Sequence, residues 1–188
     1  MQKPFYLAAV GGLVLSVAAI PFVTTPVTAK VYSTSAIALD DATIVAIFDA
    51  ANTADIETGK LAAERGQSAE VREFGAMIAR DHEMVRQLGR DLAKKLGVTP
   101  TPPGDSSSRV AHATAMRTLR ARSAAEFDLA FLHHEVAYHR AVIDAINSTL
   151  LPAIQNAELR ALVVKVAPAF EGHRLAAATM ESKLMARH

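Results

Sequence analysis

Six ionisable side chains fall among apolar residues on helices that the sequence predicts to be amphipathic: Asp55, Asp81, His82, Glu135, His139 and His173. A polar or charged side chain in an apolar stripe is costly unless another group pairs with it. Carboxylates and imidazoles on facing helices are also the groups from which helical bundles build metal sites. Such a mixture of oxygen and nitrogen donors suits iron, manganese, zinc or copper, and the sequence does not choose among them.

Helix geometry suggests how these side chains pair. Folding the first two helices about their turn brings Asp55 close to His82. Folding the last two in the same way brings His173 close to Glu135, and His139 joins them if the proline before His173 kinks the last helix. A hydrogen bond between a core histidine and a neighbouring carboxylate would satisfy each pair without a metal. A metal site and a metal-free polar network therefore both remain open.

The elements that position these residues are helices, because apolar residues recur at helical spacing and no stretch alternates as a strand does. The residues suited to begin or end a helix are Asp40 or Asp41, Gly66, Ser68, Gly97, Ser123, Pro152 and Asn156. The predicted long helices cover residues 41–65, 69–96, a segment from the Ser123 capping box to Leu150, and 157–185, with a shorter helix over 109–119. We expect an all-α four-helix bundle with one extra short helix.

The N-terminus has the three parts of a secretory signal peptide. Lys3 supplies a positive n-region, residues 5–20 supply an apolar h-region, and Val27-Thr28-Ala29 supplies small residues before a cleavage point. An uncleaved membrane anchor is the other interpretation, but this apolar run is shorter than the roughly 20 residues that span a bilayer. We therefore predict cleavage after Ala29.

The predicted domain organisation follows from this leader: a signal peptide over 1–29, a linker over 30–40 and the bundle domain over 41–188. No later segment is long and apolar enough to span a membrane, so we expect a periplasmic or secreted mature chain without a transmembrane span. Neither composition nor pattern identifies a partner protein, and both leave a homo-oligomer open.

Composition excludes several classes of function. The chain of 188 residues contains no cysteine, which rules out disulfides, thiolate metal sites and a cysteine nucleophile. Its formal net charge is +1, and it has no basic patch with interleaved aromatic residues, so we do not expect it to bind nucleic acid. It has no nucleophile-elbow, P-loop or dinucleotide-binding motif, and no histidine follows an acid by three residues as in diiron carboxylate proteins.

Four segments, in order along the chain, resemble a known bacterial family. They are Asp55–Gly66 (DIETGKLAAERG), Val71–His82 (VREFGAMIARDH), Phe127–His139 (FDLAFLHHEVAYH) and the spacing of Pro168 and His173. The family is catalogued as domain of unknown function 4142, and its members are exported proteins that are often labelled outer-membrane proteins. Its fold is regarded as ferritin-like, so the resemblance, which covers about residues 43–184, implies a ferritin-like four-helix bundle.

The resemblance also bears on single residues. His82, His139 and His173 match recurrent positions of the family. Asp55 stands where the family commonly has Glu, and Glu135 stands where it often has Gln or another polar residue. The resemblance implies no established reaction.

We therefore expect an exported helical bundle that binds a transition metal in its core and acts in envelope stress or metal handling. The predicted ligands are His82, His139, His173, Glu135 and Asp55. As an enzyme it would be a metal-dependent oxidase or peroxide scavenger, although nothing in the sequence demands turnover. The alternative is a non-catalytic structural or interaction module with a metal-free buried polar network.

Overall fold

The computed structural model describes residues 39–186, which are mostly helical and contain no strand. The predicted signal peptide over 1–29 and residues 30–38 of the predicted linker lie outside this part of the chain. No helix within 39–186 combines the length and the apolar character needed to cross a membrane. The prediction of an all-α protein is confirmed.

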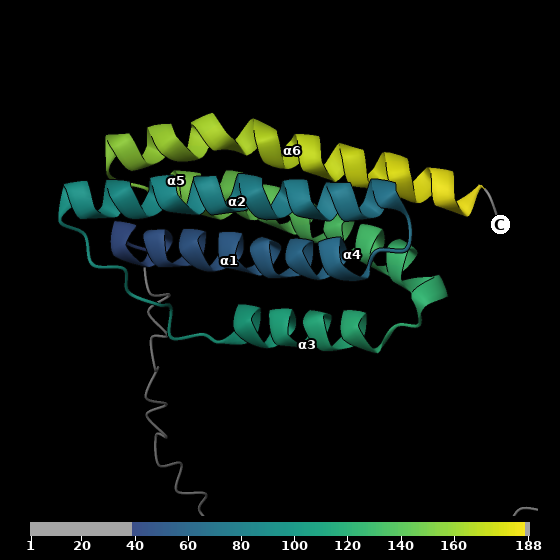
Figure 1. Ribbon diagram of the computed structural model, residues 1–188. Helices are drawn as coiled ribbons and strands as arrows, with labels where there is room; N and C mark the ends of the chain where they lie inside the picture. The colour runs from purple at the N-terminus through teal and green to yellow at the C-terminus, as the bar shows by residue number, and fades with distance from the viewer. Residues whose placement is uncertain (1–38, 187–188) are drawn as a thin grey trace, which may run out of the picture. The chain divides into compact units, whose positions relative to one another are not determined.

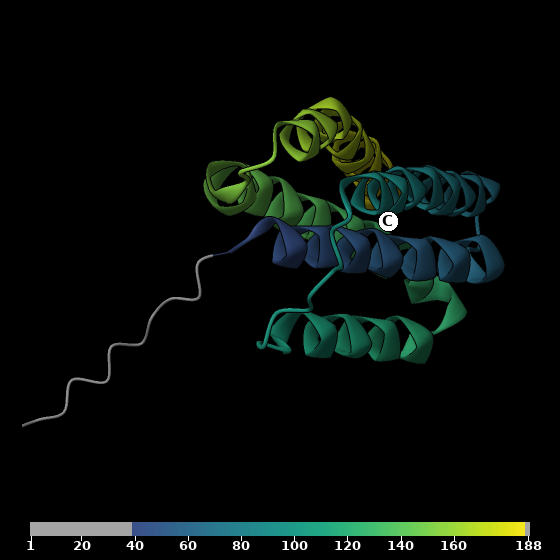
Figure 2. The same ribbon diagram turned by 90° about the vertical axis from the view of Figure 1, so that its left-hand side faces the viewer.

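The described helices follow the predicted order (Figure 1). They are α1 (Asp41–Arg65), α2 (Ala69–Leu96), α3 (Ser107–Ala121), α4 (Ala124–Ala145), the π-helix η1 (Ile146–Leu150), α5 (Leu151–Ala153) and α6 (Ala157–Met185). Helix α1 packs along α2, and α4 packs along α6. Both views place α3 on the side of α1 opposite α2, outside the four long helices (Figures 1 and 2).

One predicted helix differs from the observed one. The α-helix that we expected to run to Leu150 ends at Ala145 and continues as η1, which has π-helical hydrogen bonding. The helix does not end before Pro152: Leu150 and Leu151 keep helical dihedral angles, and the helical run continues through Ala153. The chain leaves helical geometry at Ile154, where ψ is 124°.

Side-chain caps fix where the first two helices begin and end. Asp40 accepts a hydrogen bond from the backbone N–H of Thr43 at 2.8 Å, and Ser68 accepts one from Val71 at 3.2 Å. Gly97 ends α2 in the left-handed region, with φ of 68°, which a glycine adopts without strain. Local backbone and side-chain chemistry therefore sets the start of α1 and both ends of α2.

Two aspartates tie the helix pairs to each other. Asp128 of α4 accepts hydrogen bonds from the backbone N–H groups of Gln67 and Ser68, in the turn between α1 and α2, at 2.7 and 2.9 Å. Asp41 of α1 accepts hydrogen bonds from the backbone N–H groups of residues 155 and 156, in the turn before α6, at 2.9 and 2.8 Å. An aspartate of each helix pair thus binds the turn of the other pair, and these contacts set the register between α1/α2 and α4/α6.

Helices α1 and α2 approach closely at two glycines. A Cβ atom added to Gly59 would lie 2.7 Å from the carbonyl oxygen of Gly75, and one added to Gly75 would lie 2.7 Å from that of Gly59. Real Cβ atoms do not come this close to backbone atoms, so the contact requires glycine on both helices.

We expect Gly59→Ala to lower the free energy of unfolding by about 1–3 kcal/mol, because the added methyl group would force the two helices apart. Gly172→Ala is the matched control, since an added Cβ there meets no atom within 4 Å. Alanine is the better helix former, so this control should stabilise the domain by up to about 1 kcal/mol. Urea unfolding midpoints measure both effects, and equal midpoints for the two variants would contradict the close contact.

Two apolar clusters fill the bundle, one on each side of a polar layer. The cluster beside η1 includes Ile44, Phe48, Val85, Ile146, Leu159, Val163 and Phe170. The cluster beside α3 includes Leu61, Phe74, Ile78, Met116, Phe127, Phe131, Leu132 and Ala177. Along α1, Phe48 comes first, Asn52 and Asp55 follow, and Leu61 comes last; α6 passes the two clusters in the same order, and α2 and α4 pass them in the reverse order, each with its polar residues in between. The polar side chains of all four helices therefore meet at one level of the bundle.

Candidate functional site

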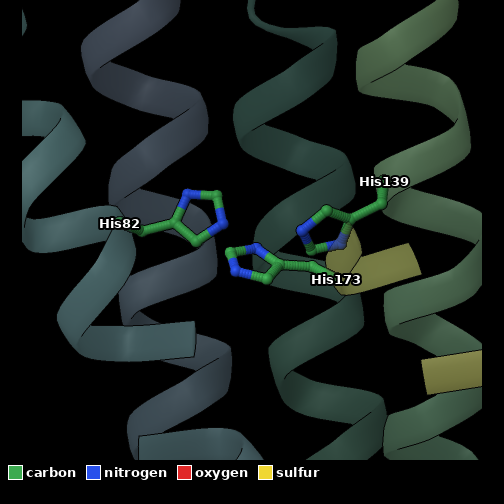
Figure 3. Close-up of side chains that lie close together, drawn as sticks. All are labelled: His82, His139 and His173. Carbon is green, nitrogen blue, oxygen red and sulfur yellow. The ribbon is translucent and has the colours of Figure 1, made fainter. Parts of the chain in front are cut away.

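Three histidines from three helices meet in the polar layer (Figure 3). His82 of α2, His139 of α4 and His173 of α6 are 2%, 1% and 6% exposed. Their ring centroids lie 5.3–5.5 Å apart, and one ring nitrogen of each lies within 4.8 Å of the others. From the sequence we expected His139 to join this group only if the last helix is kinked. In the structure His139 lies beside the other two histidines.

Asn52 determines which nitrogen of His82 carries the proton. The side-chain amide of Asn52 donates from Nδ2 to the carbonyl oxygen of Phe48 at 2.8 Å, so its Oδ1 faces His82. That oxygen lies 2.9 Å from His82 Nδ1 and can only accept a hydrogen bond. His82 Nδ1 therefore donates, and Nε2 keeps its lone pair.

The other two histidines are oriented in the same way. His139 Nδ1 lies 3.1 Å from the backbone carbonyl oxygen of Glu135, which can only accept. His173 Nε2 lies 3.1 Å from Asp81 Oδ2, so it donates to that carboxylate. The remaining nitrogens, His139 Nε2 and His173 Nδ1, are buried and have no hydrogen-bond partner, as is also true of His82 Nε2. In their neutral forms the three imidazoles thus leave three lone pairs free in one place.

Two buried carboxyl groups adjoin the histidines. Glu135 is 0% exposed and Asp55 is 2% exposed. One atom each of Asp55, Glu135 and His139 lie within 4.8 Å of one another. Both carboxylate oxygens of Glu135 and one of Asp55 have no hydrogen-bond partner. His139 therefore belongs to both groups of three, and the five residues named from the sequence form one connected cluster, which we call the His/carboxyl cluster.

The pairings inside the cluster differ in part from those expected. His82 does contact Asp55, with 3.5 Å between Nδ1 and Oδ2. The expected pairing of Glu135 with His173 is wrong: Glu135 Oε2 lies 3.4 Å from His139 Nδ1, and His173 pairs with an aspartate of α2. The expectation considered only helices adjacent in sequence, whereas α6 also faces α2 in the bundle.

Sequence reasoning missed two residues beside the cluster. Asn52 lies one turn before Asp55 on the same face of α1, and Phe170 lies one turn before His173 on α6. The Phe170 ring stacks on His82, with 5.2 Å between centroids and 7° between planes. Their spacing of three residues from a candidate ligand was the signal that could have found both.

The sequence matches the family model for a domain of unknown function, DUF4142, over residues 26–180. The chain belongs to this family. The match contains every residue of the His/carboxyl cluster, and it confirms the resemblance inferred from the four motifs. No curated protein and no solved structure matches the chain. The family description names no activity, so function has to be argued from the cluster.

Burial sets the protonation states in this DUF4142 domain. Burial, reinforced by the two neighbouring histidines, lowers the pKa of His82 to about 2. Burial also lowers the pKa of His173, against the opposing effect of its aspartate partner. Burial acts in the same sense on His139, but Glu135 and Asp55 outweigh it and raise its pKa. Burial, then the charge of Glu135, holds the pKa of Asp55 well above its ordinary value. His82 and Asp55 both favour their neutral forms, so their contact is not an ion pair.

The lowered pKa of His82 predicts acid sensitivity of the metal-free DUF4142 domain. Between the ordinary histidine pKa of 6.5 and the folded value of about 2, only the unfolded chain binds this proton. Stability is therefore present above pH 6.5 and is lost as the pH falls, by roughly 1–1.5 kcal/mol per pH unit for this residue.

Urea unfolding in the presence of a chelator between pH 7.5 and 5.5 measures this slope, and we expect it to be shallower in His82→Gln by about half a proton at pH 6.5 and by close to one proton at pH 5.5. Asp55 acts in the opposite direction, because its raised pKa costs stability above its ordinary pKa of 3.8, but it is present in both proteins. Identical slopes in the two proteins would contradict a neutral buried His82.

Proposed function

We propose that this DUF4142 domain binds a transition-metal ion in its core through His82, His139 and His173. The observation that carries the proposal is the set of three buried imidazole nitrogens that face one another without hydrogen-bond partners. Each is held in that orientation by an oxygen acceptor on its other ring nitrogen. Histidine ligands in metalloproteins are oriented in this way, with the second nitrogen donating to a carbonyl or carboxylate.

A metal explains what a structural polar network does not. In residues 39–186, the buried side-chain nitrogen and oxygen atoms without a partner number six, and all belong to the His/carboxyl cluster. Buried polar groups in native proteins are nearly always hydrogen-bonded, because leaving one unpaired costs roughly 1–3 kcal/mol. A network that served only to fix helix register would pair these atoms. Six buried polar atoms without hydrogen-bond partners at one level of a bundle are instead expected if these side chains are metal ligands.

The two carboxyl groups complete the proposed site. Asp55 and Glu135 place oxygen donors beside the imidazoles, and their negative charge would balance a divalent cation. In the metal-free state the charge of Glu135 contributes to the raised pKa of Asp55, and a cation beside both would reverse this effect. Imidazole and carboxylate together suit iron, manganese, zinc or copper. When bound, such an ion would supply Lewis acidity or, for iron, copper and manganese, a redox centre.

The proposed cellular role is metal handling or stress protection in the envelope. Export is proposed from the N-terminal 29 residues, with a mature chain that begins near Lys30 and a bundle domain over 41–188.

Metal content tests the proposal. The mature domain is purified from the periplasm without chelator or histidine tag and is analysed for metals beside a His82/His139/His173→Ala triple variant. We expect about one ion per chain in the wild type and none in the triple variant. His133→Ala is the matched control, because His133 lies on α4 but is exposed and pairs with Glu181.

Circular dichroism establishes that the triple variant remains helical, and single His→Gln variants replace it if it does not fold. Absence of metal from the wild type, or equal metal in the wild type and the triple variant, would overturn the proposal. A metal-free wild type with a merely less stable variant would favour the structural module.

A further inference from the structure

A small cavity reaches the His/carboxyl cluster from the surface. Its volume is about 70 Å³. Ala145 at its rim is exposed and Ala51 is half-buried, whereas Asn52, Asp55 and His82 at its inner end are all buried. The cavity therefore runs from the groove between α1 and α4 to two members of the cluster.

The walls between rim and cluster are apolar. They are formed by Ile47, Phe48, Val142, Ile146, Leu150 and Phe170. Ile146 and Leu150 belong to η1, and single π-helical turns within longer helices occur frequently at functional sites. The Tyr138 hydroxyl donates to the carbonyl oxygen of Ala51 at 3.1 Å, which holds α4 against α1 at the rim. The passage is thus lined by apolar side chains and ends at polar ones.

The size and chemistry of this cavity restrict what can enter. It is about half the volume of the roughly 150 Å³ cavity that holds benzene, and far below the roughly 300–1,000 Å³ of pockets for larger ligands. Its lining contains no lysine or arginine, and its one ionisable acid is Asp55, so anions are disfavoured. An uncharged molecule of two or three heavy atoms fits both limits.

We propose that a small uncharged molecule such as dioxygen passes through this cavity to the metal bound by the His/carboxyl cluster. The inference rests on the proposed function, because the metal is what the molecule would meet. Asp55, with an unpartnered oxygen at the inner end, and Asn52 are placed to contact the molecule on arrival. Larger organic substrates and anions are excluded by the same walls.

Xenon tests the cavity without any metal, because apolar cavities of this kind bind xenon. Crystals of the metal-free wild type under xenon pressure should show the atom between α1 and α4. Ala145→Phe, which places a ring at the rim, should remove it. Ala125→Phe is the matched control, since Ala125 is also exposed on α4 but lies at its opposite end.

Nitric oxide then tests access to the metal. The anaerobic protein is loaded with Fe(II), its iron content is measured, and formation of the iron nitrosyl is followed by absorbance and electron paramagnetic resonance. We expect rapid formation in the wild type and in Ala125→Phe, and a rate lower by about tenfold or more in Ala145→Phe at unchanged iron content.

Equal rates in all three proteins, or an empty cavity under xenon, would overturn this inference while leaving the metal site intact. Failure to load iron or any other metal is seen before nitric oxide is added and would instead overturn the proposed function.

Discussion

Adding zinc to the metal-free domain will raise its midpoint of thermal unfolding by roughly 8–16 °C at a thousandfold excess over the dissociation constant. A ligand that binds only the folded state stabilises it by about 4 kcal/mol at that excess, and each kcal/mol shifts the midpoint of a domain of this size by about 2–4 °C. The unfolded chain offers no such site, because His82, His139 and His173 lie on three different helices. Differential scanning calorimetry with and without zinc measures the shift.

His139→Ala should abolish this shift. His139 is shared by the three-histidine group and by the group that it forms with Asp55 and Glu135, so its loss damages both. His133→Ala, six residues away on the same helix, should keep the full shift, since that imidazole is 77% exposed. Comparing each variant with and without zinc removes the direct effect of the substitution on stability. A full shift in His139→Ala would show that zinc binds elsewhere.

Replacing Glu135 with leucine will stabilise the metal-free domain and weaken its response to metal. Replacing buried ionic groups by apolar residues of similar volume is often neutral or gains about 1–4 kcal/mol, whereas removing one partner of a well-paired buried charge is destabilising; we expect the first case here, because Glu135 makes no hydrogen bond. Glu135 is 0% exposed, and neither of its carboxylate oxygens has a hydrogen-bond partner. Its charge also acts together with burial to raise the pKa of Asp55. The substitution removes these costs together with an oxygen donor and a charge that the metal needs. Such an exchange of stability for function is common at binding sites.

Glu135→Gln separates charge from shape. Glutamine keeps the length of the side chain and can donate to Asp55, so we expect part of the gain in stability and the same loss of zinc affinity. Urea unfolding in chelator measures the first effect, and zinc titration measures the second. If Glu135 serves only to hold His139 in a structural network, both substitutions will destabilise the metal-free domain, which is the opposite sign.

The observed helix boundaries were largely predictable from local chemistry. Asp40, Ser68 and Asn156 cap helices where the sequence predicted, because a short polar side chain satisfies free backbone N–H groups wherever the chain turns. The exception is the end of α4, where η1 inserts a π-helical turn before Pro152. That turn forms where Ile146 and Leu150 pack into the cluster beside η1; Pro152 indicates an irregularity here, but the sequence does not show that it takes the form of a π-helical turn.

The inward-facing polar residues were also predictable, since helical periodicity reports which side of a helix a residue occupies. It does not report which residue of another helix lies at the same level, and that is where the expectations failed. His173 meets Asp81 instead of Glu135 because Asp41 and Asp128 hold the two helix pairs in a register that spans more than sixty residues of sequence. The sequence alone therefore determined the helices, their buried faces and the five residues of the cluster. Only the tertiary structure decided that three imidazole lone pairs converge, because their orientation depends on acceptors such as Asn52 and Asp81 that packing brings to the far side of each ring.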